Sequence, residues 1–243
     1  MSKKRVLITG AAGRIGQVVA EGLHERYQLR VLYNRTVLDQ QYDEEIVVGN
    51  LGDLDKMEEA VGGMDAVVHM AGNPSGGATF METVEANIIG THNIYEACHR
   101  KGVKRVIFAS TNHVTGMYEK KGPIYTTWDM PVRPDSYYGA SKAYGEALGR
   151  WYCDEHGLSV ICHRIGSFQP VASVINRRND RILSTWLSYK DTVQLTWRSI
   201  EASDKIDFAI YYGISGNTRA YFDLQNAREE IGYDPVDNSE DHA

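Results

Sequence analysis

Four consecutive polar residues, Ser110-Thr111-Asn112-His113, follow a hydrophobic run in the segment FASTNHVTGMY. They could form a nucleophile with its base, part of a metal site, the wall of a substrate pocket, or a turn that ends a strand. A hydrolase is disfavoured because no strained nucleophile turn surrounds Thr111, and His113 is poorly placed to reach its hydroxyl. The histidines also lack HxH or HExxH spacing, so we expect no metal.

A tyrosine and a lysine four residues apart, Tyr138 and Lys142 in YGASK, form the second chemical group. On a helix this spacing places both side chains on one face. A nearby ammonium group favours the phenolate and lowers the pKa of the tyrosine. We therefore expect Tyr138 to act as a base that Lys142 activates.

Three glycines, Gly10, Gly13 and Gly16 in TGAAGRIG, lie between a predicted strand and a predicted helix. Glycine allows a sharp turn, a close approach to a pyrophosphate and tight packing of the helix on the strand. The free N–H groups of the helix N-terminus then face the anion. In this context the pattern predicts a dinucleotide site.

The end of the second predicted strand bears on the choice between NAD and NADP. An acidic residue there would bond the ribose of NAD and repel the extra phosphate of NADP. This chain instead has Asn34-Arg35, a neutral residue followed by a cation. The local chemistry favours NADP, although Asn34 can also bond a ribose hydroxyl and Arg35 could be a solvated loop residue.

The elements that would position these groups alternate between β-rich and helical stretches. We expect strands over 5–9, 29–33, 45–48, 66–70, 105–109 and 159–165, and helices over 14–26, 54–61, 84–101 and 138–156. Apolar strands separated by helices indicate a doubly wound parallel sheet covered on both faces. We therefore expect a dinucleotide-binding domain over residues 1–165 and a small C-terminal substrate lobe over 166–243, laid over the open edge of the sheet.

Composition excludes several classes of partner. The chain has 243 residues, 26 basic and 32 acidic, for a net charge of −6, which disfavours nucleic acid as a partner. No segment is long enough to span a membrane, and the N-terminus has no signal-like apolar run. The odd, unpaired set of Cys98, Cys153 and Cys162 is typical of a reduced, cytoplasmic protein.

The motifs together resemble the extended short-chain dehydrogenase/reductase superfamily, also called the NAD-dependent epimerase/dehydratase superfamily. The resemblance rests on TGAAGRIG, HMAG, Asn87 in EANIIGT, FAST and YGASK, and it covers nearly the whole chain. More narrowly, FASTNH, RPDSYYGASKAYGE, RIGS and RILSTW are similar to the uronate dehydrogenases and related sugar 1-dehydrogenases. This resemblance implies a Rossmann fold. It also implies oxidation of the C1 hydroxyl of a cyclic uronate or related anionic aldose to a lactone, with hydride transfer to NAD(P).

The resemblance also implies roles for individual residues. The catalytic residues would be Thr111 as the catalytic hydroxyl, Tyr138 as the base, Lys142 as its activator and Asn87 as a structural and proton-relay residue behind the site. Sugar-binding residues would be Ser75, Thr111, Asn112, His113 and Ser167, with Arg181 holding the anionic group. The cofactor would contact Gly10, Gly13, Arg14, Ile15, Gly16, Asn34, Arg35, Asn50, Leu51, Met70, Ala71, Gly72, Tyr138 and Lys142.

Some features depart from the family pattern. Members that use NAD usually carry acids where this chain has Asn34 and Asn50, so the departures favour NADP while the resemblance favours NAD. The stretch 171–179 looks longer than expected and adds Arg177 and Arg178, which keeps a phosphorylated sugar possible as substrate.

Alternative functions remain open. A hexose-6-phosphate 1-dehydrogenase of the same group fits the same motifs. A nucleotide-sugar epimerase or dehydratase would need a larger C-terminal lobe, and a dehydratase would need carboxylates after Thr111. An NAD(P)-sensing module without turnover is a further alternative, which the intact Thr111, Tyr138 and Lys142 oppose.

The resemblance also implies a homodimer or higher homo-oligomer built on the helix that bears Tyr138, although the rings of Tyr144, Trp151 and Tyr152 could equally pack internally.

Overall fold

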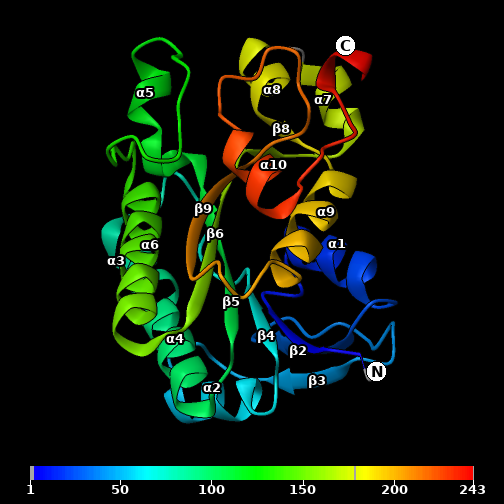
Figure 1. The fold of residues 1–243 in the computed structure, drawn as a ribbon, viewed down its shortest axis with the longest axis vertical. Helices are drawn as coiled ribbons and strands as arrows, with labels where there is room; N and C mark the ends of the chain where they lie inside the picture. Colours follow the sequence, from blue (N-terminus) through cyan, green and yellow to red (C-terminus); the bar gives the residue numbers. More distant parts are fainter. Residues whose placement is uncertain (1–2, 178, 243) are drawn as a thin grey trace.

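A seven-stranded, wholly parallel sheet forms the centre of the computed structural model, which describes residues 3–177 and 179–242. The strand order is β3-β2-β1-β4-β5-β6-β9. Helices α2, α4 and α6 cover one face and helices α1 and α9 cover the other (Figure 1). The expected doubly wound parallel sheet is confirmed.

The helices and strands have the following bounds. The strands are β1 (Arg5–Thr9), β2 (Gln28–Tyr33), β3 (Glu45–Val48), β4 (Ala66–His69), β5 (Arg105–Thr111), β6 (Ser159–Ile165), β7 (Ser167–Phe168), β8 (Trp186–Leu187) and β9 (Phe208–Gly213). The α-helices are α1 (Arg14–Leu23), α2 (Leu54–Val61), α3 (Phe80–Thr83), α4 (Gly90–Lys101), α5 (Met117–Lys120), α6 (Tyr137–His156), α7 (Val171–Arg177), α8 (Asp180–Thr185), α9 (Tyr189–Ile200) and α10 (Gln225–Ile231). The π-helix η1 (Val84–Ile89) and the 3-10 helices η2 (Asn112–Thr115) and η3 (Ser239–His242) complete the set.

The central strands are apolar on both faces because both faces are covered. In β5 all seven residues are buried. Val106 and Phe108 pack into the core under α2 and α4, whereas Ile107 packs into the core on the α1 side. This alternation follows from the two-residue period of a strand, and it explains why the strand sequences are continuous apolar runs rather than alternating ones.

Several predicted boundaries differ from the structure, three of them by more than one residue. The strand predicted to end at Ala109 continues to Thr111, so the first two polar residues of the opening motif belong to β5. The single helix expected over 84–101 begins as the π-helix η1, which contains the buried Asn87. The first helix ends at Leu23 rather than Arg26, and the chain then turns so that Tyr27 is buried in the core.

The last segment of the chain contributes both to the sheet and to the structure above it. Strand β9 pairs with β6 and extends the main sheet, and α9 packs on α1. Helices α7 and α8 and the short β7–β8 pair lie beyond the sheet, at the same end as α5 (Figure 1). The proposed division at residue 165 stays a prediction, and the segment after it is interleaved with the first domain.

The three cysteines are buried with free thiols, and His69 lies fully buried in β4. Among the described helices, none combines the length and apolar character needed to cross a membrane.

A buried histidine should make the fold sensitive to acid. Burial lowers the pKa of His163 from 6.5 to about 3, and its Nε2 lies 2.8 Å from the Ser199 hydroxyl on α9. The unfolded chain therefore binds a proton below pH 6.5 that the folded chain does not, so stability is complete above pH 6.5 and is lost as the pH falls toward 3. We expect this group alone to lower the free energy of unfolding by about 1.5 kcal/mol between pH 6.5 and 5.

The measurement is urea unfolding at a series of pH values. The His163→Gln variant should show a smaller loss between pH 6.5 and 5, and His156→Gln, which removes an exposed histidine, should behave like the parent. If the free energy of unfolding falls equally with pH in the parent and in His163→Gln, burial of a neutral His163 is not the cause of the acid sensitivity.

Candidate active site

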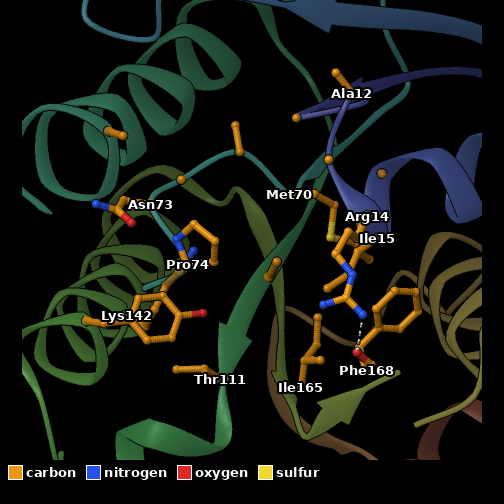
Figure 2. A pocket seen from close by; sticks show the side chains of 18 of the residues that line it. Ala12, Arg14, Ile15, Met70, Asn73, Pro74, Thr111, Lys142, Ile165 and Phe168 are labelled. Carbon is orange, nitrogen blue, oxygen red and sulfur yellow. Dashed lines mark hydrogen bonds between the residues drawn. The ribbon is translucent and has the colours of Figure 1, made fainter. Parts of the chain in front are cut away.

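A cleft of about 920 Å³ opens at the carboxyl ends of the central strands. Ligands of open parallel sheets bind at this edge. Most of the predicted site residues line it, namely Gly10, Gly13, Arg14, Ile15, Gly16, Asn34, Arg35, Asn50, Leu51, Met70, Ala71, Gly72, Thr111, Asn112, His113, Tyr138, Lys142, Ser167 and Arg181. Figure 2 shows Lys142 and Thr111 on one side of the cleft and Arg14 with Phe168 on the other.

The glycine turn has the shape that a bound dinucleotide requires. A Cβ on Gly10 would lie 2.7 Å from the Ala71 nitrogen, and one on Gly16 would lie 2.2 Å from the Gly10 oxygen. Gly10 also has a φ of +68°. Helix α1 begins after Gly13 with no side-chain cap and no acid in its first turn, and its first residues line the cleft. These residues fit a pyrophosphate.

The part of the cleft lined by Asn34, Arg35 and Asn50, where we expect the adenosine and which we call the adenosine end, contains a carboxylate that the sequence did not reveal. Asn34 and Arg35 are exposed and line the cleft, as the NADP interpretation requires. Asn50, however, donates from Nδ2 to Glu85 Oε1 at 3.0 Å, and Glu85 lines the same cleft. Negative charge is therefore present near Asn50 although the usual acid is not, which weakens the charge argument against NAD.

Thr111 and Tyr138 lie together at the floor of the cleft. Thr111 ends β5, and its hydroxyl accepts a hydrogen bond from the backbone nitrogen of His113 at 3.3 Å. Burial raises the pKa of Tyr138, and a hydrogen bond with the Thr111 side chain opposes that rise. The Thr111 hydroxyl is therefore close enough to act on the Tyr138 phenol, as the sequence predicts, while the role of Tyr138 as a base and its activation by Lys142 stay predictions.

Lys142 is almost fully buried beside this pair, with 4% of its surface exposed. Its Nζ lies 4.8 Å from the centre of the Phe108 ring, a cation–π contact. Burial lowers the pKa of Lys142 to about 8. Burial lowers the pKa of His69 to about 3, and the positive charge of Lys142 contributes to this shift.

Asn87 connects the loop after β4 to the helix that bears Tyr138. Its Oδ1 accepts a hydrogen bond from the backbone nitrogen of Asn73 at 2.7 Å, and its Nδ2 donates to the Ser141 hydroxyl at 2.9 Å. Ser141 in turn donates to the Tyr138 carbonyl at 2.8 Å. Asn87 does not line the cleft, so the geometry supports the structural part of its expected role, while its part as a proton relay stays a prediction.

His113 is oriented by an acid that sequence reasoning missed. Its Nδ1 lies 2.9 Å from Asp135 Oδ2, and its ring meets the Tyr138 ring edge-on with centroids 5.9 Å apart. Burial raises the pKa of Asp135, but the hydrogen bonds from His113 and Ser136 outweigh it and lower the pKa overall. An Nδ1–H held by this carboxylate leaves Nε2 available to a ligand. RPDSYY contains Asp135, but no spacing rule connects it to His113.

The other residues predicted to bind sugar are connected through a second acid that the sequence did not reveal, Glu119. Arg181 donates from Nε to Glu119 Oε2 at 2.8 Å and from a terminal nitrogen to the Ser167 hydroxyl at 3.1 Å. Asn112 donates from Nδ2 to Glu119 Oε1 at 2.8 Å. Three residues from separate elements are thus brought together as the resemblance implied. We call Asn112, His113, Ser167 and Arg181 the sugar end of the cleft.

Some predicted residues lie elsewhere. Ser75 is exposed and is not among the residues that line the cleft, where its neighbours Asn73 and Pro74 lie instead (Figure 2). Its place in substrate binding stays a prediction. The side chains of Arg177 and Arg178 lie outside the described part of the structure. Among the described residues, no group of three or more His, Cys, Asp or Glu is placed to hold a metal ion.

Comparisons with known proteins agree with this geometry. A family model described as the NAD dependent epimerase/dehydratase family matches residues 6–188. A uronate dehydrogenase of Pseudomonas syringae pv. tomato is 40% identical over 238 residues, a match that covers 97% of this chain and 83% of that protein. A structure of the Agrobacterium tumefaciens uronate dehydrogenase, a variant complexed with NAD, has a TM-score of 0.86 and 34% identity, covering 99% of this chain and 87% of that one.

Two relatives from Haloferax volcanii are named for other sugars. The NAD-dependent glucose-6-phosphate dehydrogenase is 36% identical, covering 96% of this chain and 94% of that protein. The L-arabinose 1-dehydrogenase (NAD(P)(+)) is 37% identical, covering 97% of each. Similar sequences are thus named for a carboxylated, a phosphorylated and a neutral sugar.

The protonation of Lys142 can be measured without any ligand. In protein labelled with ¹³C at the lysine ε-carbon, we expect one resonance to titrate near pH 8, because burial disfavours the charged amine, while ordinary lysines titrate at about 10.4. Lys142→Arg should remove that resonance, and Lys101→Arg, at an exposed site, should leave it. A spectrum in which every lysine titrates above pH 10 would contradict the burial argument.

Proposed function

The chain belongs to the NAD-dependent epimerase/dehydratase family, and on that premise we propose that it is an NAD(P)-dependent sugar 1-dehydrogenase. Its reaction is oxidation of the C1 hydroxyl of a cyclic uronate or related aldose to a lactone. The observation that carries the proposal is a single cleft that contains the glycine turn, the Thr111–Tyr138 contact and the sugar end.

The residues of the chain account for the proton and for the position of the substrate. Tyr138, as phenolate, takes the proton of the C1 hydroxyl, and Thr111 holds the reacting oxygen in line. The buried ammonium of Lys142 favours the phenolate. When bound, the nicotinamide supplies a positive charge and the carbon that accepts hydride from C1. Loss of this hydride and proton leaves a C1 carbonyl, which in the ring is a lactone.

The choice of cofactor remains between NAD and NADP. Arg35 provides a cation at the place where a 2′-phosphate would lie, and a solved relative contains NAD. Glu85 beside Asn50 keeps negative charge at the adenosine end. We propose that both cofactors are accepted.

A second candidate is oxidation of a hexose 6-phosphate at the same carbon. The glucose-6-phosphate dehydrogenase among the relatives favours it, and Arg181 can hold a phosphate as well as a carboxylate. In either case the sugar is bound at Asn112, His113, Ser167 and Arg181.

We further propose a cytoplasmic homodimer. The buried free cysteines support a reducing compartment. Extended members of the superfamily that the chain resembles pair through the helix of the catalytic tyrosine and the one before it. On α6, Tyr152 is buried but Trp151 is 50% exposed, so one ring packs internally and the other is available to a partner.

Substrate and cofactor can be tested together by following reduced cofactor at 340 nm. NAD and NADP are crossed with D-glucuronate, D-galacturonate, glucose 6-phosphate and neutral aldoses. We expect turnover with a uronate and, in Tyr138→Phe, a loss of at least about 100-fold in kcat with cofactor binding retained. If no sugar reduces either cofactor while Tyr138→Phe binds cofactor like the parent, the protein is an NAD(P)-sensing module instead.

The dimer can be tested by analytical ultracentrifugation. Trp151→Glu places a charge in the proposed interface and should convert dimers to monomers at micromolar concentration. Trp128→Glu, at a similarly exposed tryptophan outside α6, should leave the mass unchanged. A parent protein that sediments as a monomer would refute the proposal.

A further inference from the structure

Glu119 organises the sugar end from behind. It lies on the short helix α5, and its side chain is only 11% exposed. One carboxylate oxygen accepts from Asn112, and the other accepts from both Arg181 and the Tyr221 hydroxyl, each at 2.8 Å. A single acid therefore fixes two predicted substrate-binding side chains.

The ion pair leaves the outer part of Arg181 available to a substrate. The side chain is 47% exposed, and its contacts with described residues use the Nε–H and one terminal N–H out of five donors. Because Glu119 binds through Nε, the terminal nitrogens can still face a ligand in the cleft. The charge of Arg181, however, is cancelled by its neighbour.

Charged groups of both signs lie around the sugar end, among them Lys120, whose Nζ donates to the Asp135 carbonyl at 3.2 Å. Asp135 adds a second carboxylate behind His113. Of the other cations that line the cleft, Arg14 donates to the neutral Phe168 carbonyl and keeps its charge, and Arg35 lies beyond the end of β2, at the adenosine end. Lys142 is buried beside Phe108. Among the described cations that line the cleft, Arg181 is thus the one that a carboxylate pairs.

The carboxylate also selects the orientation of the Asn112 amide. A carboxylate only accepts hydrogen bonds, so Asn112 must turn its NH₂ toward Glu119 and its oxygen toward the Thr111 hydroxyl, 3.5 Å away. Ser167 is similarly restricted. Thr185 already donates to the Arg181 carbonyl, so the Ser167 hydroxyl donates to Thr185 and offers a lone pair to the cleft.

We propose that Glu119 determines how this site discriminates between sugars by the charge on their distal carbon. This inference rests on the proposed function. By cancelling the charge of Arg181 while holding its terminal nitrogens in place, Glu119 lets the site bind a neutral hydroxymethyl group as well as a carboxylate. It acts through Arg181 and Asn112 and is a positioning residue, not a catalytic one. Removing its charge turns the site into one that selects anions.

The test uses sugars with the same ring stereochemistry. Kinetics with D-glucuronate and D-glucose give the ratio of kcat/KM for the charged and the neutral sugar. Glu119→Gln should raise this ratio about tenfold, because Arg181 then acts as an uncompensated cation on the carboxylate. Glu119→Asp keeps the charge but shortens the side chain, so both rates should fall with the ratio unchanged. Glu58→Gln makes the same chemical change at a surface ion pair and should alter neither the two rates nor their ratio.

Binding separates this inference from the proposed function. Calorimetric titration with the same two sugars of the protein saturated with reduced cofactor, which cannot accept a hydride, gives the ratio of affinities without turnover. A tenfold shift in that ratio in Glu119→Gln, with no turnover in the parent, would support the role of Glu119 and refute the dehydrogenase. Turnover with an unchanged ratio in Glu119→Gln would refute the role of Glu119 alone. If neither sugar binds the parent, both proposals fail.

Discussion

The close approach of α6 to β5 is the constraint on which the site depends. Helix α6 packs on β5, and on η2 directly after it, through positions that have no side chain. A Cβ at Gly139 would lie 2.4 Å from the His113 carbonyl oxygen, and one at Gly145 would lie 2.3 Å from the Phe108 ring. Because these contacts are so close, a tyrosine from the first turn of the helix reaches the threonine at the end of the strand. Removing that proximity would separate the proposed base from the hydroxyl.

A second layer of polar contacts holds this arrangement from behind. Asn87 connects the loop after β4 to the first turn of α6, and the π-helical turn in which it lies places its amide between the two. Single π-helical turns are frequent at functional sites. Deeper still, Glu146 accepts from Ser110 and Arg164, so α6, β5 and β6 share one buried ion pair. A pair of this kind fixes geometry more than it adds stability.

The sequence predicted the local parts of the protein well. The glycine turn and YGASK could be recognised because each is contained within one turn or one helix, where spacing fixes geometry. The apolar runs predicted β1, β4 and β5 because buried parallel strands have few alternatives. By contrast, β9 follows an irregular segment, and nothing in FAIYYG indicates that it pairs with β6.

Glu119 and Asp135 could not have been predicted from the sequence. Each lies in the long connection between β5 and α6. The side chain that each one orients is distant in the sequence or belongs to an unrelated motif. Arg181 is 62 residues from Glu119, and Asp135 is 22 residues from His113. The resemblance identified many of the residues that line the cleft, whereas the acids that orient Asn112, His113 and Arg181 could be found only in the folded chain.

The buried amine of Lys142 has a thermodynamic consequence. Near pH 8 about half of the unliganded molecules carry it neutral, because that is where its pKa lies. Any ligand that favours one of the two forms therefore takes up or releases a proton as it binds. Its apparent affinity then varies with pH, and its measured binding enthalpy includes the heat of ionisation of the buffer. An enthalpy measured in one buffer alone would describe the proton transfer as much as the ligand.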